Sequence, residues 1–216
     1  MENKIKYIHF VGIGGSGMSG IAEIMHNMKF EVTGSDTSST SVTKHLENRG
    51  IKLFTNHNAS NINQADVVVT SSAISKNNCE LVAAKKLKIP IIPRAEMLAE
   101  LMRFKVGIAI AGTHGKTSTT SILASIMNTA GMDPTYVIGG RINSLKQSAR
   151  LGKSKYMIVE ADESDASFLH LNPDNILLTN IDYDHMETYG YDEQRLKKTF
   201  LDFLHQIPFY NEVFVC

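Results

Sequence analysis

The sequence has little cysteine, no excess of charge and no long apolar run, and each shortage excludes a class of protein. Its two cysteines, Cys79 and Cys216, are too few for a disulfide framework, which favours a reducing compartment. Twenty-two basic residues balance 22 acidic ones, so no overall field attracts nucleic acid or an anionic membrane. No apolar stretch approaches the ~20 residues of a membrane-spanning helix, and the first residues lack a signal-peptide core. We therefore expect a soluble, cytoplasmic protein that binds neither nucleic acid nor membrane.

Short apolar runs alternate with helix-like segments along the whole chain, which is typical of a parallel α/β architecture. The length of 216 residues and the 43% hydrophobic content suit one large or two modest domains. No low-complexity linker marks a boundary, but a fresh α/β unit begins near Val106. We predict a Rossmann-like parallel-sheet domain over residues 1–104. A P-loop-type α/β ATPase domain should follow over residues 105–216.

The same alternation predicts the individual elements. Strands are expected at residues 5–12, 30–34, 51–54, 67–70, 89–93, 106–111, 156–160, 176–181 and 212–216. Helices are expected at residues 19–28, 42–50, 78–87, 94–104, from the loop at 112–115 to about 130, and at 195–206. The last strand reads as a central strand with no partner or turn after it, which predicts that the chain is part of something longer.

Residues 112–120 read Gly-Thr-His-Gly-Lys-Thr-Ser-Thr-Thr and directly follow an apolar run. A glycine turn that opens a helix directs backbone N–H groups at one spot, where the helix dipole adds positive potential. Lys116 would add a full charge, and the Thr117 hydroxyl can reach a magnesium ion. Only two residues separate the two glycines, whereas the Walker pattern has four, so the loop differs from that of common kinases and GTPases. The pattern predicts a nucleoside triphosphate site; the alternative is an ordinary turn with an incidental lysine.

A second glycine loop lies near the N-terminus, where residues 12–17 read Gly-Ile-Gly-Gly-Ser-Gly. It follows a predicted strand and opens a helix, and Asp36 lies 19 residues beyond Gly17 at the end of the next strand. This is the spacing of a dinucleotide-binding loop with a ribose-binding carboxylate. It indicates that a diphosphate can approach the backbone, and NAD, FAD and UDP-sugars all carry one. The alternative is that the glycines serve only tight helix–strand packing.

Two polar clusters follow predicted strands, Glu-Ala-Asp-Glu-Ser-Asp at 160–165 and Asn-Ile-Asp-Tyr-Asp-His at 180–185. Ligands bind beyond the carboxyl ends of parallel strands, so both clusters should border the lysine loop. Thr117 with Glu160 is the first choice for a magnesium ion, which prefers oxygen ligands. His185 is either a ligand of a second ion or a neutral ring bonded to Asp184. Three further acidic residues are read as a solvated loop or helix cap: Asp162, Glu163 and Asp165.

Of the other histidines, only His57 lies in a loop of the first domain where a ligand could reach it. The remaining five show no partner pattern and are read as structural: His9, His26, His45, His170 and His205.

Taken together, these stretches resemble the Mur ligase family, and the resemblance covers all 216 residues. It depends on residues 12–23, 34–36, 93–102, 111–120, 160–168 and 180–189. Within the family, the stretch at 160–168 is most similar to the members that act on UDP-N-acetylmuramate and L-alanine. Such ligases have a Rossmann-like domain for the UDP-sugar, a central ATPase domain and a C-terminal domain that completes the adenine and amino-acid sites.

The resemblance implies that ATP phosphorylates the lactyl carboxylate of UDP-N-acetylmuramate and that L-alanine attacks the acyl phosphate. It implies ATP and Mg²⁺ as cofactors and the two other compounds as small-molecule partners. The catalytic residues would be Lys116, Glu160 and His185, and the metal ligands Thr117, Glu160 and His185. The ATP-binding residues would be Gly112, Thr113, His114, Gly115, Lys116, Thr117 and Ser118. The UDP-sugar-binding residues would be Gly14, Gly15, Ser16, Gly17, Asp36, His57, Ser71, Ser72 and Ala73.

Compared with the family, the chain stops within the central domain, so we expect it to lack turnover by itself. Two alternatives stay open. The first is a truncated relative that binds nucleotide without catalysis. The second is an NAD-dependent oxidoreductase, which the loop at 12–17 and Asp36 would explain but the Lys116 loop and the acidic clusters would not.

Overall fold

The computed structural model describes residues 5–138 and 149–216 and divides into two compact units, Met1–Met97 and Leu98–Cys216. The sequence placed the boundary seven residues later, after residue 104, because a fresh strand begins there. The division into compact units falls within helix α4 (Arg94–Met102), and the boundary after residue 104 stays a prediction. The second half of α4 packs on the second unit, since the Met102 methyl group occupies the space where a Cβ on Gly107 would lie.

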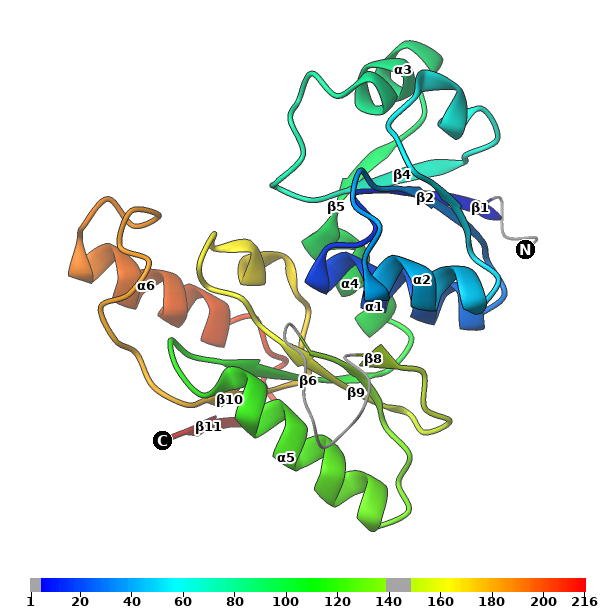
Figure 1. Ribbon diagram of the computed structural model, residues 1–216. Helices are drawn as coiled ribbons and strands as arrows, with labels where there is room; N and C mark the ends of the chain where they lie inside the picture. Colours follow the sequence, from blue (N-terminus) through cyan, green and yellow to red (C-terminus); the bar gives the residue numbers. More distant parts are fainter. Residues whose placement is uncertain (1–4, 139–148) are drawn as a thin grey trace. The chain divides into compact units, whose positions relative to one another are not determined.

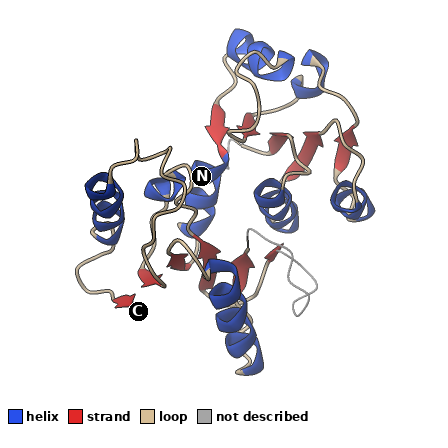
Figure 2. Ribbon diagram, turned by 60° about the vertical axis from the view of Figure 1, so that its left-hand side comes forward, coloured by secondary structure: helices blue, strands red, loops and turns tan. Residues whose placement is uncertain are grey.

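The first unit is a five-stranded, fully parallel sheet in the order β3-β2-β1-β4-β5. Helices α1 and α2 lie on one face of this sheet, and α3 with the 3-10 turn η1 lies on the other (Figure 1, Figure 2). The strand order changes direction between β1 and β4, which is where open α/β sheets bind ligands. The elements are β1 (Tyr7–Val11), α1 (Ser16–Asn27), β2 (Glu31–Ser35), α2 (Ser41–Asn48), β3 (Lys52–Phe54), η1 (Ala59–Ile62), β4 (Val67–Thr70), α3 (Cys79–Leu87) and β5 (Ile91–Pro93).

The central strands of this sheet are buried on both faces, which explains their continuous apolar sequences. Along β1, Val11 packs with Val68 of β4 and with Leu81 and Ala84 of α3. The alternate residue Phe10 points to the opposite face and is fully buried there. The sheet is thus held by helices on both sides and keeps its carboxyl edge open for loops.

The second unit has a six-stranded sheet in the order β11-β10-β6-β9-β7-β8. Helix α5 lies on one face, and α6 and the 3-10 turn η2 lie on the other (Figure 1). All neighbouring strands are parallel except β7 and β8, which are antiparallel, so the sheet is mixed. The elements are β6 (Val106–Ala111), α5 (Lys116–Thr129), β7 (Thr135–Val137), β8 (Ala149–Arg150), β9 (Tyr156–Glu160), η2 (Ser167–His170), β10 (Asn175–Leu178), α6 (Glu193–Leu204) and β11 (Val213–Val215).

Two apolar clusters fill the faces of this second sheet. Under α5, Ile110 of β6 and Ile158 of β9 pack with Ala124 and other buried residues. On the opposite side, three phenylalanines join η2 to α6: the Phe168 ring lies 5.3 Å from that of Phe200 and 4.6 Å from that of Phe203, centroid to centroid. The helices are therefore fixed on the sheet, and the loops between them are held at its carboxyl edge.

The predicted α/β class with a parallel N-terminal sheet is confirmed, and the sheet of the second unit is mixed because β8 pairs antiparallel with β7. Four short elements have no counterpart among the elements expected from the sequence: η1, η2, β7 and β8. The final strand was expected to have no partner, but β11 pairs with β10, Ile176 opposite Val213. Strand β10 also ends earlier than expected, because the chain turns after Leu178 toward the lysine loop. Within the described ranges, no helix combines the length and apolar character needed to cross a bilayer.

Candidate functional site

Two glycines in the left-handed region shape the loop between β6 and α5. Gly112 has φ +130° and Gly115 has φ +82°, conformations that other residues rarely adopt. Space requires the first glycine as well, because a Cβ on Gly112 would overlap the hydroxyl of Thr179 and the backbone of Asn180. Since β6 lies between β10 and β9, the loop emerges at the carboxyl edge next to the ends of both neighbours.

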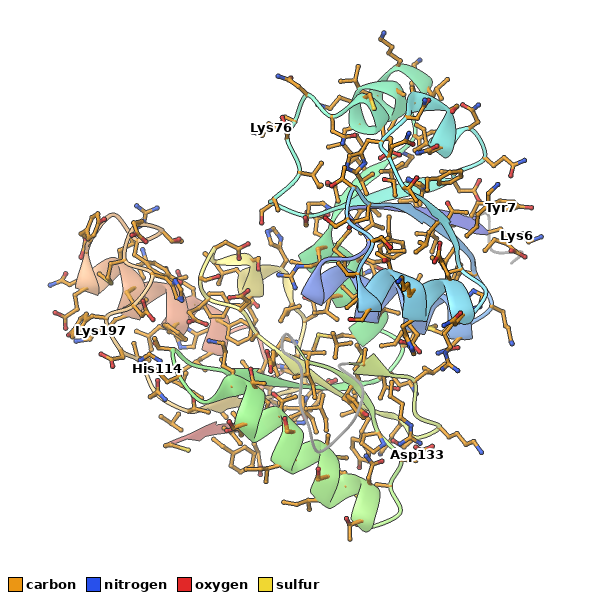
Figure 3. The ribbon with its side chains drawn as sticks, in the orientation of Figure 1. Lys6, Tyr7, Lys76, His114, Asp133 and Lys197 are labelled. Atoms are coloured by element: carbon orange, nitrogen blue, oxygen red, sulfur yellow. The ribbon has the colours of Figure 1, made fainter. Side chains whose placement is uncertain are left out.

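The segment after β10 holds this loop by hydrogen bonds. The N–H groups of Thr113 and His114 donate to the backbone oxygen and the Oδ1 of Asn180, at 3.2 and 2.9 Å. The Thr179 hydroxyl donates to the His114 oxygen at 2.7 Å, and the Asp182 N–H donates to Thr113 Oγ1 at 2.9 Å. The His114 side chain, labelled in Figure 3, is exposed. Its Nε2 lies 3.4 Å from Asp182 Oδ2. The sequence-based prediction that residues 113 and 114 bind a phosphate stays a prediction; in this structure their N–H groups donate to Asn180.

The first turn of α5 keeps its backbone donors available. Its N-cap, Gly115, offers no side-chain acceptor. In the described part of the chain, the N–H groups of Lys116, Thr117 and Ser118 have no hydrogen-bond partner. Three such donors at the positive end of a helix of 14 residues suit an anion, and phosphate binding there stays a prediction.

Lys116 is held in place by the loop and by a buried carboxylate. Its Nζ lies 2.7 Å from the oxygen of Gly112 and 3.1 Å from that of Thr113, and it forms an ion pair of 2.7 Å with Glu163 Oε2. Glu163 is 1% exposed, and its Oε1 has no hydrogen-bond partner among the described residues. Burial raises the pKa of the Glu163 carboxyl, and the neighbouring ammonium opposes that rise. The expectation that Glu163 lies in a solvated loop or helix cap is therefore wrong.

The loop that carries Glu163 is itself tied to the chain before α6. The Tyr189 hydroxyl donates to the Glu163 backbone oxygen, and burial raises the pKa of Tyr189 to about 12. The two other acidic residues of the loop behave as expected of a loop or cap. Asp162 Oδ1 accepts the N–H of Ser164 at 3.1 Å, and Asp165 Oδ1 accepts the N–H of Ser167 at 2.9 Å.

The three predicted metal ligands come from separate elements around this loop. Thr117 lies in the first turn of α5, and Glu160 ends β9 opposite Ile110 of β6. His185 has a left-handed backbone, its N–H donates to Asp184 Oδ1 at 2.8 Å, and its Nε2 lies 3.8 Å from Asp184 Oδ2. No group of three or more His, Cys, Asp or Glu residues within the described ranges is arranged to hold a metal ion. The proposed set uses a hydroxyl as one of its three ligands, and its role stays a prediction.

In the first unit, the glycine loop lies between β1 and α1 and contacts Asp36 directly. The N–H of Gly14 donates to Asp36 Oδ2 at 2.8 Å, so the carboxylate helps to fix the loop. Gly15 is the N-cap of α1 and has no side-chain cap; Ser16 begins the helix, and its side chain is not described. A Cβ on Gly17 would lie 2.7 Å from Arg94 Nη1. Arg94, which directly follows β5, therefore lies beside the expected diphosphate position.

The other predicted contacts of the UDP-sugar come from loops at the same edge of the sheet. His57 follows β3, and its Nδ1 lies 2.9 Å from both Ser35 Oγ and Glu80 Oε2. Ser71, Ser72 and Ala73 form a turn after β4, closed by the N–H of Ile74 on the Ser71 oxygen. Among the histidines read as structural, His9 and His45 lie next to the buried carboxylates of Glu80 and Glu23, at 3.5 and 3.3 Å.

Comparison with known families shows which family the chain belongs to. A model described as "Mur ligase family, catalytic domain" matches residues 7–106, and one described as "Mur ligase middle domain" matches residues 110–216. The chain belongs to the Mur ligase family. Curated relatives named UDP-N-acetylmuramate–L-alanine ligase, from Neisseria meningitidis serogroup C (strain 053442) and Polaromonas sp. (strain JS666), are each 58% identical over all 216 residues. The chain spans 46% of the length of these relatives.

Solved structures of Mur ligases show the same fold. The UDP-N-acetylmuramate–alanine ligase MurC from Thermotoga maritima matches with a TM-score of 0.86 and 31% identity, over 97% of this chain and 48% of that one. The UDP-N-acetylmuramate:L-alanyl-γ-D-glutamyl-meso-diaminopimelate ligase from Neisseria meningitides matches with a TM-score of 0.89 and 29% identity, over 98% of this chain and 71% of that one. The two units of this Mur ligase chain therefore occur together in its relatives.

Proposed function

We propose that this chain is the UDP-sugar-binding and ATP-binding part of an ATP-dependent amide ligase that joins L-alanine to the lactyl carboxylate of UDP-N-acetylmuramate in the cytoplasm. The observation that carries the proposal is the 58% identity, over every residue of the chain, to proteins of that name. The reaction would pass through an acyl phosphate and would supply a precursor of peptidoglycan.

The lysine loop supports the ATP half of the proposal. The free N–H groups at the start of α5 and the ammonium of Lys116 suit the β- and γ-phosphates, which need positioning and charge neutralisation more than covalent help. A bound phosphate would compete with Glu163 for Lys116, so the ion pair would loosen as the nucleotide enters. Thr117 and Glu160 would hold one Mg²⁺ and His185 would help to hold a second. Bound Mg²⁺ would neutralise phosphate charge as it develops.

The first unit supports the UDP-sugar half. The backbone at residues 14–17 opens α1 without a side-chain cap, and the guanidinium of Arg94 adjoins Gly17, so a diphosphate would meet both a helix N-terminus and a fixed positive charge. Asp36, His57 and the turn at residues 71–73 surround the same edge and would contact the nucleoside or sugar.

The test is a calorimetric titration of the chain with UDP-N-acetylmuramate and, separately, with Mg-ATP, using NADH as the control ligand. We expect binding of the UDP-sugar, weaker binding of Mg-ATP, and no binding of NADH. Lys116→Met should remove Mg-ATP binding and leave UDP-sugar binding unchanged, since the residue belongs to the second unit. Binding of NADH alone would instead favour the oxidoreductase interpretation.

Turnover needs a separate measurement, because the chain spans about half of the length of the ligases it resembles. We expect that the chain with ATP, L-alanine and UDP-N-acetylmuramate releases no phosphate and forms no amide. Amide formed by this chain alone would contradict that expectation.

A further inference from the structure

A fully buried carboxylate lies beneath the predicted nucleoside site. Glu80 of α3 accepts the Ser35 hydroxyl at 2.6 Å and faces His57 Nδ1 at 2.9 Å, both on Oε2. Its Oε1 accepts the Asn61 amide at 2.6 Å and lies 3.5 Å from His9 Nε2. Burial by itself would raise the pKa of Glu80, but the hydrogen bonds from these four side chains lower it to about 2. Glu80 is therefore an anion, and an anion can only accept hydrogen bonds.

This arrangement determines which nitrogen of His57 carries the proton. The single hydrogen of the Ser35 hydroxyl is donated to Glu80, so the hydroxyl can only accept a hydrogen bond from His57. Both neighbours of Nδ1 are then acceptors, and Nδ1 must carry a hydrogen. In the neutral form of the ring, Nε2 is then the acceptor. The His57 side chain is 19% exposed, and within residues 5–138 and 149–216 its Nε2 has no hydrogen-bond partner.

The His57 ring lies at the edge of the sheet where the UDP-sugar is expected to bind. His57 follows β3, and Ser35 is the last residue of the neighbouring strand β2. The next residue, Asp36, accepts the N–H of Gly14 in the glycine loop. The ring therefore lies at the carboxyl edge of the sheet, on the same strand ends as that loop.

We propose that Glu80 is a positioning residue that fixes His57 as the Nδ1–H tautomer, so that Nε2 accepts a hydrogen bond from the nucleoside of the bound UDP-sugar. This inference rests on the proposed function of the first unit. A uridine nucleotide offers donors of the required kind, the N3–H of uracil and the ribose hydroxyls. In the opposite tautomer, His57 Nε2 would carry a hydrogen and could not accept a hydrogen bond from these donors.

The first experiment needs no ligand. Long-range ¹H–¹⁵N spectra of the histidine rings report which nitrogen is protonated, and we expect the Nδ1–H tautomer for His57 in the unmodified chain. In Glu80→Gln the amide can donate toward the ring, so the Nδ1–H population should fall. The matched control is Glu23→Gln: Glu23 is another buried carboxylate of the first unit, paired with His45 and Arg49, and its loss should leave the His57 signals unchanged.

The second experiment measures UDP affinity by calorimetry and compares UDP with its 2′-deoxy, 3′-deoxy and N3-methyl analogues. Loss of one hydrogen bond should weaken binding of one analogue by about 10-fold in the unmodified chain. That difference should vanish in His57→Ala, which identifies the donor. Glu80→Gln should weaken UDP itself by a similar factor, while Glu23→Gln should not.

The outcomes separate the two proposals. If the unmodified chain does not bind UDP, the proposed function of the first unit is wrong. If UDP binds but His57→Ala still distinguishes the analogues as the unmodified chain does, His57 does not accept from the nucleoside. An Nε2–H tautomer in the unmodified chain would overturn the role of Glu80 even if Glu80→Gln failed to fold, and an unchanged tautomer in a folded Glu80→Gln would do the same.

Discussion

Acid should unfold the first unit chiefly through Glu80. Its pKa in the folded protein is about 2, compared with an ordinary value of 4.5, so the unfolded chain binds a proton more readily. Stability from this group is therefore fully present above about pH 4.5 and is lost as the pH falls toward 2. The depression is equivalent to about 3 kcal/mol, and solvent does not screen it because the side chain is 0% exposed. That is a large share of the ~5–15 kcal/mol that stabilises a typical domain.

Urea denaturation at a series of pH values, followed by the backbone amide signals of β1 and β2, measures this contribution. Glu80→Gln should be less stable than the unmodified chain at neutral pH. Between about pH 4.5 and 2, however, its free energy of unfolding should fall by about 3 kcal/mol less than that of the unmodified chain, because glutamine does not ionise. Glu47→Gln, at an exposed position of α2, is the control and should keep the acid slope of the unmodified chain. Equal slopes for Glu80→Gln and the unmodified chain would refute the reasoning.

Three further predictions concern the second unit. Gly112→Ala should abolish Mg-ATP binding in calorimetry and lower the melting temperature, because the φ of +130° and the contact with the Thr179 hydroxyl both disfavour a Cβ. Lys116→Met should lower stability by roughly 3–5 kcal/mol in denaturant titrations, since Glu163 is left buried without its partner, and Lys116→Met/Glu163→Gln should recover most of that loss. Phe200→Ala should destabilise the unit by about 3–5 kcal/mol through the cavity it leaves under α6, whereas Leu201→Ala at the exposed neighbouring position should change stability little.

The sequence was sufficient where local periodicity and burial agree. Strands such as Val67–Thr70 and Val106–Ala111 were predicted to the residue, because both faces of a parallel sheet are covered and the apolar run has sharp ends. Helix ends moved by one to three residues, as at α1, where the glycine loop passes directly into the helix. The strand β8 has two residues, too few for any period to show.

The candidate site was predictable in its location but not in its contacts. The residue types and spacing of Gly112 and Lys116 indicate the loop from sequence alone. The polar residues that follow strands indicate the carboxyl edge of the sheet, where the structure also has them. Glu163 was missed because nothing local distinguishes it from Asp162: only the fold buries one and leaves the other in a turn. Glu80 was missed for the same reason, since its partners come from three other segments of the chain.

The central place of β6 in the second sheet has a consequence for how this unit acquires its structure. Its first strand pairs only with later ones: Ile108 lies opposite Ile158, and Ile110 opposite Leu177. Each pairing closes a loop of many residues before any contact repays the lost chain entropy. During synthesis, the apolar strand β6 therefore stays unpaired until β9 and β10 have left the ribosome. We expect this unit to fold more slowly than the first, where β1 can pair with β2 after a single helix.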